Sequence, residues 1–103
     1  MRVRVELWLG LSKREAEAEG LGSGMCARLD LEAEEGTTVR ELFGRLAAQY
    51  QPVAQHLFDG DAGEFRPDVL VTVNERIADR TEACDVRLKE GDKMAVFPLQ
   101  IGG

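Results

Sequence analysis

Two stretches of the chain alternate apolar and polar side chains with a period of two residues, and this pattern limits the fold more than any other feature of the sequence. In residues 2–11, one parity is held by Val3, Val5, Leu7, Leu9 and Leu11. In residues 25–33, one parity is held by Met25, Ala27, Leu29, Leu31 and Ala33. Because successive side chains of a strand point to opposite faces, both stretches predict strands that bury one face. They therefore require a second layer that covers the apolar side of a sheet.

A charged and glycine-rich segment, residues 12–24, separates these two strands. We interpret it as a long hairpin loop, which makes the two strands antiparallel neighbours. We expect this loop to be mobile and to touch a binding partner. The alternative is that it is only a solvated spacer.

The covering layer is predicted to be a helix that begins after Thr38. Thr38 and Glu41 have the spacing of a capping box, in which the hydroxyl accepts from the N3 amide and the carboxylate accepts from the cap amide. Apolar residues then follow at helical spacing, namely Val39, Leu42, Phe43, Leu46 and Tyr50. Pro52 ends the helix at about Gln49–Gln51, because the residue before a proline disfavours the helical conformation.

The remaining residues predict three more strands and no further domain. Residues 51–67 form a connection in which Val53, Leu57 and Phe58 could support a short second helix. Residues 68–74 predict a strand, the turn 74–76 leads to a short strand around Ile77, and residues 81–88 are expected to be irregular. The predicted order is β-β-α-β-β-β within a single α+β domain, residues 1–103.

The last eleven residues, 93–103, predict a closing strand followed by a thin tail. Pro98 is expected to end the sheet ladder, because proline has no N–H to donate. Residues 99–103 are then a flexible tail that ends on Gly102 and Gly103. Glycine has no side chain, so such a tail can enter a channel too narrow for other residues. A carboxylate on this stalk is a suitable substrate for activation by another enzyme.

Composition excludes several classes of function. The net charge of −6 and the absence of a basic run argue against binding to nucleic acid or to anionic membranes. The chain has 2 cysteines, Cys26 and Cys84, too far apart in sequence for a Cys-x-x-Cys pair, and His56 is the only histidine. A zinc cluster is therefore not expected. The first residues alternate in polarity and do not resemble a signal peptide, so we expect a cytoplasmic protein.

The sequence of residues 68–103 resembles the MoaD/ThiS family of sulfur carriers. Its signature in this chain comprises Val69–Asn74, Leu88, Gly91-Asp92, Ala95-Val96-Phe97-Pro98 and Gly102-Gly103. The family includes the small subunit of molybdopterin synthase, the thiamine-pathway carrier and the ubiquitin-related modifier. The sequence departs from the pattern at Glu75, where glycine is common, and in the longer segments 12–24 and 51–67.

The resemblance implies a β-grasp, or ubiquitin-like, fold with a mixed sheet packed on one main helix. It also implies that an adenylating, ubiquitin-activating-like enzyme consumes ATP to activate Gly103, which then gains sulfur as a thiocarboxylate. Gly102 and Ile101 would thread into the partner. The acceptor would be an enzyme such as the molybdopterin synthase large subunit, and the carrier itself would be neither a catalyst nor a cofactor-binding protein. Phe97-Pro98 favours the molybdopterin branch over tRNA thiolation, thiamine or another sulfur metabolite. A ubiquitin-like modifier and a plain interaction module remain the alternatives.

Two aromatic residues predict the docking face. Trp8 lies on the charged parity of the first strand, and Phe97 lies on the outward parity of the last strand. In a β-grasp fold these strands are parallel neighbours, so both rings should share the open face of the sheet. Together with Leu99 they form a predicted partner interface. The alternative is that residues 51–67 fold over the two rings and bury them.

Overall fold

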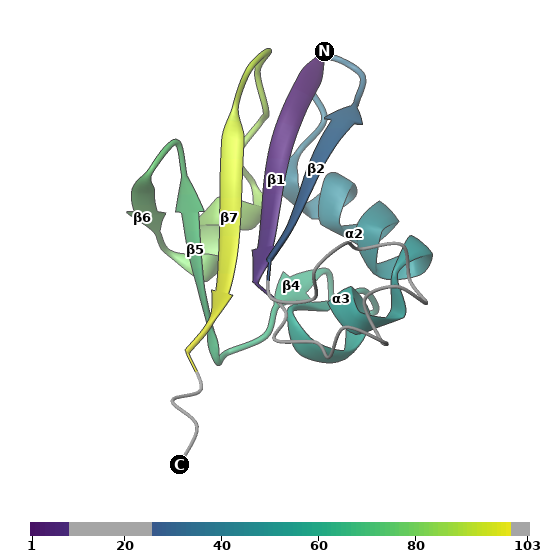
Figure 1. The fold of residues 1–103 in the computed structure, drawn as a ribbon, viewed down its shortest axis with the longest axis vertical. Coiled ribbons are helices and arrows are strands. Elements are labelled where there is room, and N and C mark those ends of the chain that lie inside the picture. The colour runs from purple at the N-terminus through teal and green to yellow at the C-terminus, as the bar shows by residue number, and fades with distance from the viewer. Residues whose placement is uncertain (9–25, 100–103) are drawn as a thin grey trace.

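The computed structural model describes residues 1–8 and 26–99, and its main layer is a mixed five-stranded sheet (Figure 1). The strand order is β2-β1-β7-β5-β6. The bounds of these strands are β1 Arg2–Trp8, β2 Cys26–Glu32, β5 Val69–Val73, β6 Arg76–Ala78 and β7 Lys93–Pro98. A separate two-stranded sheet joins β3 (Phe58–Asp59) to β4 (Glu64–Phe65). The helices are α2 (Val39–Gln49), α3 (Gln51–His56) and α4 (Arg80–Cys84).

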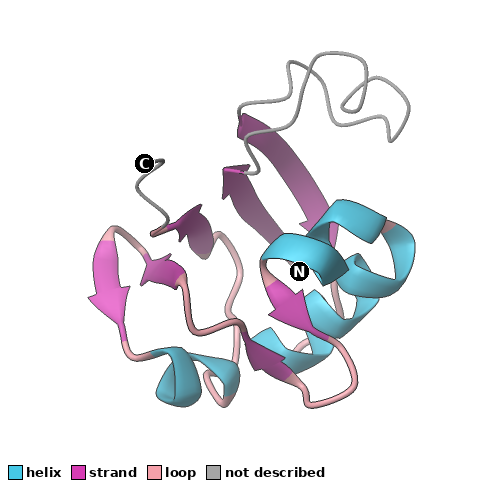
Figure 2. Ribbon diagram, turned by 90° about the horizontal axis from the view of Figure 1, so that it is seen from below, coloured by secondary structure: helices cyan, strands magenta, loops and turns pink. Residues whose placement is uncertain are grey.

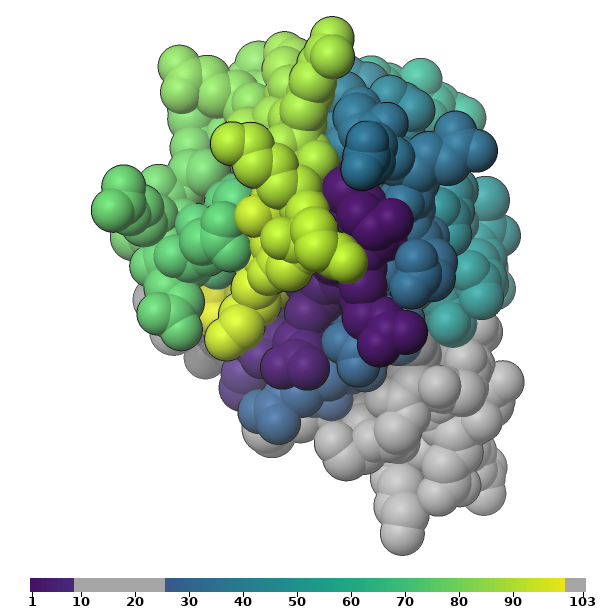
Figure 3. All heavy atoms as spheres, turned by 90° about the horizontal axis from the view of Figure 1, so that it is seen from above, coloured from purple at the N-terminus to yellow at the C-terminus, as the bar shows by residue number. Residues whose placement is uncertain are grey.

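The first and last strands lie side by side at the centre of the sheet. β1 pairs with β2 in antiparallel order and with β7 in parallel order, with Leu7 opposite Val96. Figure 3, seen from the N-terminal end of β1, shows this strand between β2 and the start of β7. This arrangement confirms the predicted α+β fold of the β-grasp type, with a mixed sheet packed on one main helix.

The core lies between one face of the sheet and the helices, which gather on one side of the sheet (Figure 2). The sheet contributes the residues of one parity, all buried: Val3, Val5, Leu7, Ala27, Val69, Val71, Met94 and Val96. Helix α2 contributes buried residues at the predicted spacing, namely Val39, Leu42, Phe43 and Leu46. None of the helices within residues 1–8 and 26–99 has the length and hydropathy needed to cross a bilayer.

Helix α2 begins and ends where the sequence predicts. The Thr38 hydroxyl accepts from the amide of Glu41 at 3.2 Å, as expected for a cap. The Glu41 carboxylate differs from the expectation, because it accepts from the Thr38 hydroxyl at 3.1 Å. The helix ends at Gln49, and α3 starts at Gln51 with Pro52 in its first turn, where a missing N–H costs no helical hydrogen bond.

Two local elements differ from the sequence prediction. Residues 81–88 were expected to be irregular, but Asp79 caps a short helix there by accepting from the amides of Thr81 and Glu82. The connection 51–67 contains not only the expected helix α3 but also the hairpin β3–β4. Phe58 and Phe65 of that hairpin pack edge-to-face at 5.1 Å, and Phe65 packs in the same way on Phe43 at 4.9 Å. The segment thus extends the helix-side core.

The turn between β5 and β6 holds two residues with positive φ, Asn74 (51°) and Glu75 (69°). Asn74 connects this turn to the start of β7. Its Nδ2 donates to Asp92 Oδ1 at 3.1 Å, and its Oδ1 accepts from the Lys93 amide at 3.0 Å. Asparagine tolerates the left-handed conformation better than most residues, whereas a glutamate there is strained.

The variant Asn74→Ala should therefore lower the free energy of unfolding by about 1 to 2 kcal/mol, because two hydrogen bonds are lost and alanine is strained at positive φ. Glu75→Gly should have the opposite sign, a gain of up to about 1 kcal/mol, because glycine adopts positive φ freely. Urea denaturation of the two variants beside the parent measures both changes. Equal destabilisation by both variants would contradict this account of the turn.

Candidate functional site: the open face of the sheet

An aromatic stack lies on the sheet face opposite the helices. Trp8 and Phe97 are stacked with ring centroids 5.5 Å apart and an interplanar angle of 26°. Both side chains are half-buried. Segment 51–67 packs into the helix-side core, so it does not cover the two rings. The structure thus confirms that Trp8 and Phe97 share one face.

Further apolar residues enlarge this stack into a patch, which we call the apolar patch. Leu70 lies opposite Phe97 in the β5–β7 ladder, and Ile77 lies opposite Thr72, which itself lies opposite Ala95. Ile77 is 74% exposed and Leu99 is 48% exposed, and both are among the large apolar side chains that the described part of the chain leaves to solvent. The apolar patch consists of Trp8, Leu70, Ile77, Phe97 and Leu99, whereas Ala95 on the same parity of β7 is buried. Exposed apolar side chains that gather on one face are typical of a binding site.

The strand that leads to the tail is held one residue further than expected. Pro98 lies opposite Val69, and the amide of Leu99 donates to the Asp68 carbonyl at 2.7 Å. The strand thus ends at Pro98, as predicted, but one further main-chain hydrogen bond follows it, because a proline removes one donor and the next amide can still pair. Ile101, Gly102 and Gly103, the residues predicted to thread into a partner and carry sulfur, lie outside the described residues, as does the loop 12–24.

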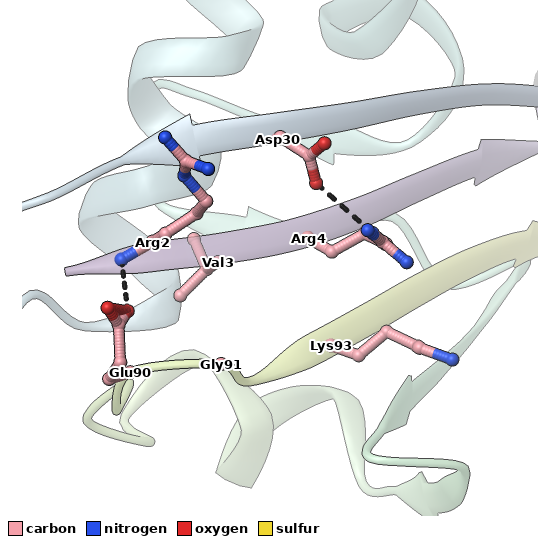
Figure 4. Close-up of a pocket in the computed structure, with 7 residues that line it drawn as sticks. All are labelled: Arg2, Val3, Arg4, Asp30, Glu90, Gly91 and Lys93. Carbon is pink, nitrogen blue, oxygen red and sulfur yellow. Dashed lines mark hydrogen bonds and ion pairs between the residues drawn. The ribbon is translucent and has the colours of Figure 1, made fainter.

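The other end of the same face is charged, and its charges are paired within the molecule. The ion pairs are Arg2–Glu32 at 3.3 Å, Arg4–Asp30 at 3.1 Å, Arg28–Glu6 at 3.6 Å and Lys93–Glu75 at 3.7 Å. Figure 4 shows the cavity of about 360 Å³ at this end, where Arg4 points to Asp30 and the Arg2 amide donates to Glu90. Because each cation already has a carboxylate partner, this cavity does not offer an anion an unpaired positive charge.

A depression of about 290 Å³ lies between the charged end and the apolar patch. Its lining combines both characters: Glu6, Thr72, Glu75, Lys93, Met94, Ala95 and Phe97. A partner side chain with an apolar stem and a polar tip would fit there, since the Phe97 ring lies at one rim of the depression and the charged Glu6, Glu75 and Lys93 lie at the other. The face is thus suited to recognition of a protein.

The described residues offer no catalytic constellation on this face. Within residues 1–8 and 26–99, no group of three His, Cys, Asp or Glu side chains is placed to hold a metal ion. Cys84 is buried, and its thiol donates to the Arg80 carbonyl at 3.3 Å.

Cys26 is the one described thiol at this face, and it is held in its neutral form. Burial raises the pKa of the Cys26 thiol, the Glu6 carboxylate raises it further, and Arg28 lowers it in part. A thiol with a raised pKa is a weak nucleophile at neutral pH, because the thiolate is the reactive species. Cys26 is therefore not suited to carry sulfur itself.

Replacing Glu6 by glutamine should increase the alkylation rate of Cys26 by iodoacetamide at pH 8. The neutral amide no longer raises the pKa of the thiol, so the thiolate fraction grows, and we expect a rate roughly two- to fivefold higher. Peptide mass spectrometry separates Cys26 from Cys84. The matched control is Glu32→Gln on the same face, which should leave the rate unchanged; equal rates in all three proteins would contradict the assigned role of Glu6.

Sequence reasoning identified Trp8, Phe97 and Leu99 but missed Leu70 and Ile77. The parity of residues 68–74 places Leu70 on the outward face, so part of the signal was present. Its contact with Phe97 depends on the register between β5 and β7, which a single sequence does not contain.

Several solved structures share this fold. SAMP1 from Haloferax volcanii has a TM-score of 0.68 at 22% identity and covers 100% of both chains. Urm1 from Trypanosoma brucei has a TM-score of 0.67 at 22% identity, covering 99% of this chain and 95% of its own. A Pyrococcus furiosus protein described as a "putative molybdopterin converting factor, subunit 1" has a TM-score of 0.59 at 24% identity, covering 95% of this chain and 97% of its own. At these identities the similarity establishes the ubiquitin-like β-grasp fold alone.

Comparison of sequences gives a more specific result. Among curated proteins no sequence matches significantly. The model of the ThiS family, in contrast, matches residues 16–103, which include the main helix and the whole of the signature at 68–103. The chain therefore belongs to the ThiS family of ubiquitin-like proteins.

Proposed function

We propose that this protein is a sulfur carrier whose Gly103 carboxylate is adenylated and then converted to a thiocarboxylate. One observation carries the proposal: the apolar patch, with Phe97 and Leu99, lies at the end of β7 from which residues 100–103 continue. A partner that binds the patch would thus hold the start of the tail. Membership of the ThiS family supports the same function.

The chemistry requires three steps on a partner enzyme. The Gly103 carboxylate attacks the α-phosphorus of ATP, pyrophosphate leaves, and an acyl adenylate forms. A persulfide sulfur on the partner then attacks the acyl carbon and displaces AMP. A thiol cleaves the resulting acyl disulfide by attack on the partner's sulfur, and the carrier leaves with a terminal thiocarboxylate. In this scheme the partner enzyme supplies the general base and the carrier supplies only the carboxylate.

The body of the carrier acts as a docking module for two kinds of partner. One is an adenylating, ubiquitin-activating-like enzyme, and the other is an enzyme that accepts the sulfur. The net charge of −6 favours partners with basic surfaces, since complementary charge raises association rates. The apolar patch supplies affinity near the tail.

Within the family we favour molybdopterin synthesis as the pathway, with the molybdopterin synthase large subunit as acceptor. The Phe97-Pro98 sequence supports this choice, and one protein with the same fold is described as subunit 1 of the molybdopterin converting factor. The alternatives are carriers for tRNA thiolation, thiamine or another sulfur metabolite. Supplying the loaded carrier separately to each class of acceptor enzyme would distinguish them.

The test of the carrier function is direct. We expect intact-protein mass spectrometry to show replacement of one oxygen by sulfur after incubation with a family activating enzyme, ATP and a sulfur donor. The added sulfur should map to Gly103 and disappear on transfer to an acceptor. No change of mass with any family activating enzyme would count against the proposal.

A ubiquitin-like modifier is the second candidate function, favoured by the shared fold with proteins described as small archaeal modifier protein 1. A modifier would form an isopeptide bond between Gly103 and a substrate lysine. Conjugates that survive denaturing gels would support this function, whereas a carrier without this activity gives the thiocarboxylate only.

A further inference from the structure

Among the residues that the structure describes, the outer edge of β2 is the longer of the two unpaired edges of the main sheet. β2 and β6 are the edge strands, and β6 spans only Arg76–Ala78 whereas β2 spans Cys26–Glu32 (Figure 1). An exposed edge presents main-chain N–H and C=O groups that can pair with another strand. The groups that β2 offers at this edge are those of the residues whose main-chain N–H and C=O point away from β1.

The register of β1 and β2 determines which residues of β2 these are. Met1 and Ala33 exchange both main-chain hydrogen bonds, at 2.8 and 2.9 Å. Because hydrogen-bonded and non-hydrogen-bonded pairs alternate in an antiparallel ladder, the odd residues of β2 bond to β1. Its even residues point their main-chain groups outward, and these are Cys26, Arg28, Asp30 and Glu32. The Arg45 guanidinium donates a hydrogen bond to the Glu32 carbonyl at 3.3 Å, and no other described residue bonds to the outward main-chain groups of these four residues.

The side chains of these even residues are complementary to a second copy of the same strand. Arg28 pairs with Glu6 and Asp30 pairs with Arg4 within one copy, but Arg28 remains 73% exposed and Asp30 57% exposed, so both can also face a second strand. Leu29 lies between them. In an antiparallel pair centred on Leu29, each Arg28 lies opposite Asp30 of the other copy. A shift by two residues in either direction would instead oppose two arginines or two aspartates. Opposite charges across strands stabilise pairing and like charges destabilise it, so the sequence favours one register.

We propose that two copies of this chain pair through the outer edges of their β2 strands, antiparallel and centred on Leu29. The two sheets then form one continuous sheet. On the helix side, Leu29 meets Leu29 and Ala27 meets Leu31, which are all apolar. In this dimer neither copy covers β1, β7 or β5 of the other, so both apolar patches stay accessible. The two-fold axis places the ends of the two β7 strands at opposite ends of the joined sheet. The proposed carrier function does not require this dimer, and the dimer leaves the surface used for that function accessible.

A disulfide crosslink tests the register. In the Cys26→Ser background, Leu29→Cys places two cysteines directly opposite each other in a non-hydrogen-bonded pair, with Cα atoms about 4.5 Å apart. This separation lies within the range that a disulfide bridges, so mild oxidation should give a covalent dimer on non-reducing gels. The matched control is Leu31→Cys in the same background, on the same face of the strand. Its partner residue is Ala27, and the two cysteines are about 13 Å apart along the strands, so it should remain monomeric.

Charge reversal tests the pairing without a crosslink. In a dimer of the Arg28→Asp variant, both cross-strand pairs consist of two aspartates. In a dimer of the Asp30→Arg variant, both pairs consist of two arginines. Each variant alone should therefore dimerise roughly tenfold or more weakly than the parent. An equimolar mixture restores both opposite-charge pairs and should dimerise like the parent. Sedimentation velocity over a dilution series measures all four samples.

Other occupants of this edge predict different results. If the edge serves an extended segment of an unrelated protein, the parent stays monomeric to roughly millimolar concentration and neither cysteine variant crosslinks. That result overturns the proposal. Crosslinking of both cysteine variants, or a mixture as weak as its components, also overturns it.

Discussion

Deletion of Gly103 should reduce sulfur loading of the chain at least a hundredfold without changing its stability. The deletion moves the carboxylate back along the tail by about 3.5 Å. A misplacement of even 1 Å can cost about a hundredfold in rate, because the carboxylate no longer meets the nucleotide in a reactive geometry. The variant still ends on a glycine, so any loss of loading is due to the position of the carboxylate and not to a larger terminal side chain.

The expected stability of this variant follows from the fold. The last residue with a described hydrogen bond to the sheet is Leu99, whose amide donates to Asp68. Adenylate formation is measured as pyrophosphate release, and loading as the oxygen-to-sulfur mass change. The control Gln100→Ala alters the tail but keeps its length, and should load normally. Full loading of the shortened chain would contradict the role assigned to Gly103.

Sequence alone predicted the elements that carry a strong period. The parity of residues 2–11 and 25–33 identified β1 and β2, and the cap at Thr38 identified the start of α2. The aromatic pair of the site required one further rule, that the first and last strands of the fold are parallel neighbours. Local pattern and topology together thus placed Trp8 beside Phe97.

The elements that were missed are too short to show a period. β3 and β4 have 2 residues each, and α4 has 5. Their stability comes from tertiary contacts, as with Phe65 on Phe43, and not from local propensity. The position of Ile77 on the open face likewise depends on pairing with Thr72, which the sequence of β6 does not encode by itself.

The variant Phe97→Ala should weaken binding to the activating enzyme by about 2 kcal/mol or more, close to thirtyfold in Kd. Phe97 lies at the centre of the apolar patch, between Trp8 and Leu70, where aromatic anchors contribute most to protein interfaces. The free protein loses the stack with Trp8, worth about 1 kcal/mol, and the partial burial of the ring beside Leu70, which is less than a fully buried ring loses. Titration calorimetry measures the binding loss, and urea denaturation measures the stability loss.

Two comparison variants, one in the core and one at the rim of the patch, distinguish a binding role of Phe97 from a structural one. Phe43→Ala removes a fully buried ring and should destabilise the fold by about 3 to 5 kcal/mol. Ile77→Ala lies at the outer rim of the patch and should weaken binding less than Phe97→Ala, since rim residues contribute little. If Phe97→Ala destabilises the fold as Phe43→Ala does while binding persists, then Phe97 is a core residue. In that case the partner binds elsewhere, and the apolar patch exists to support β7 and not to recognise another protein.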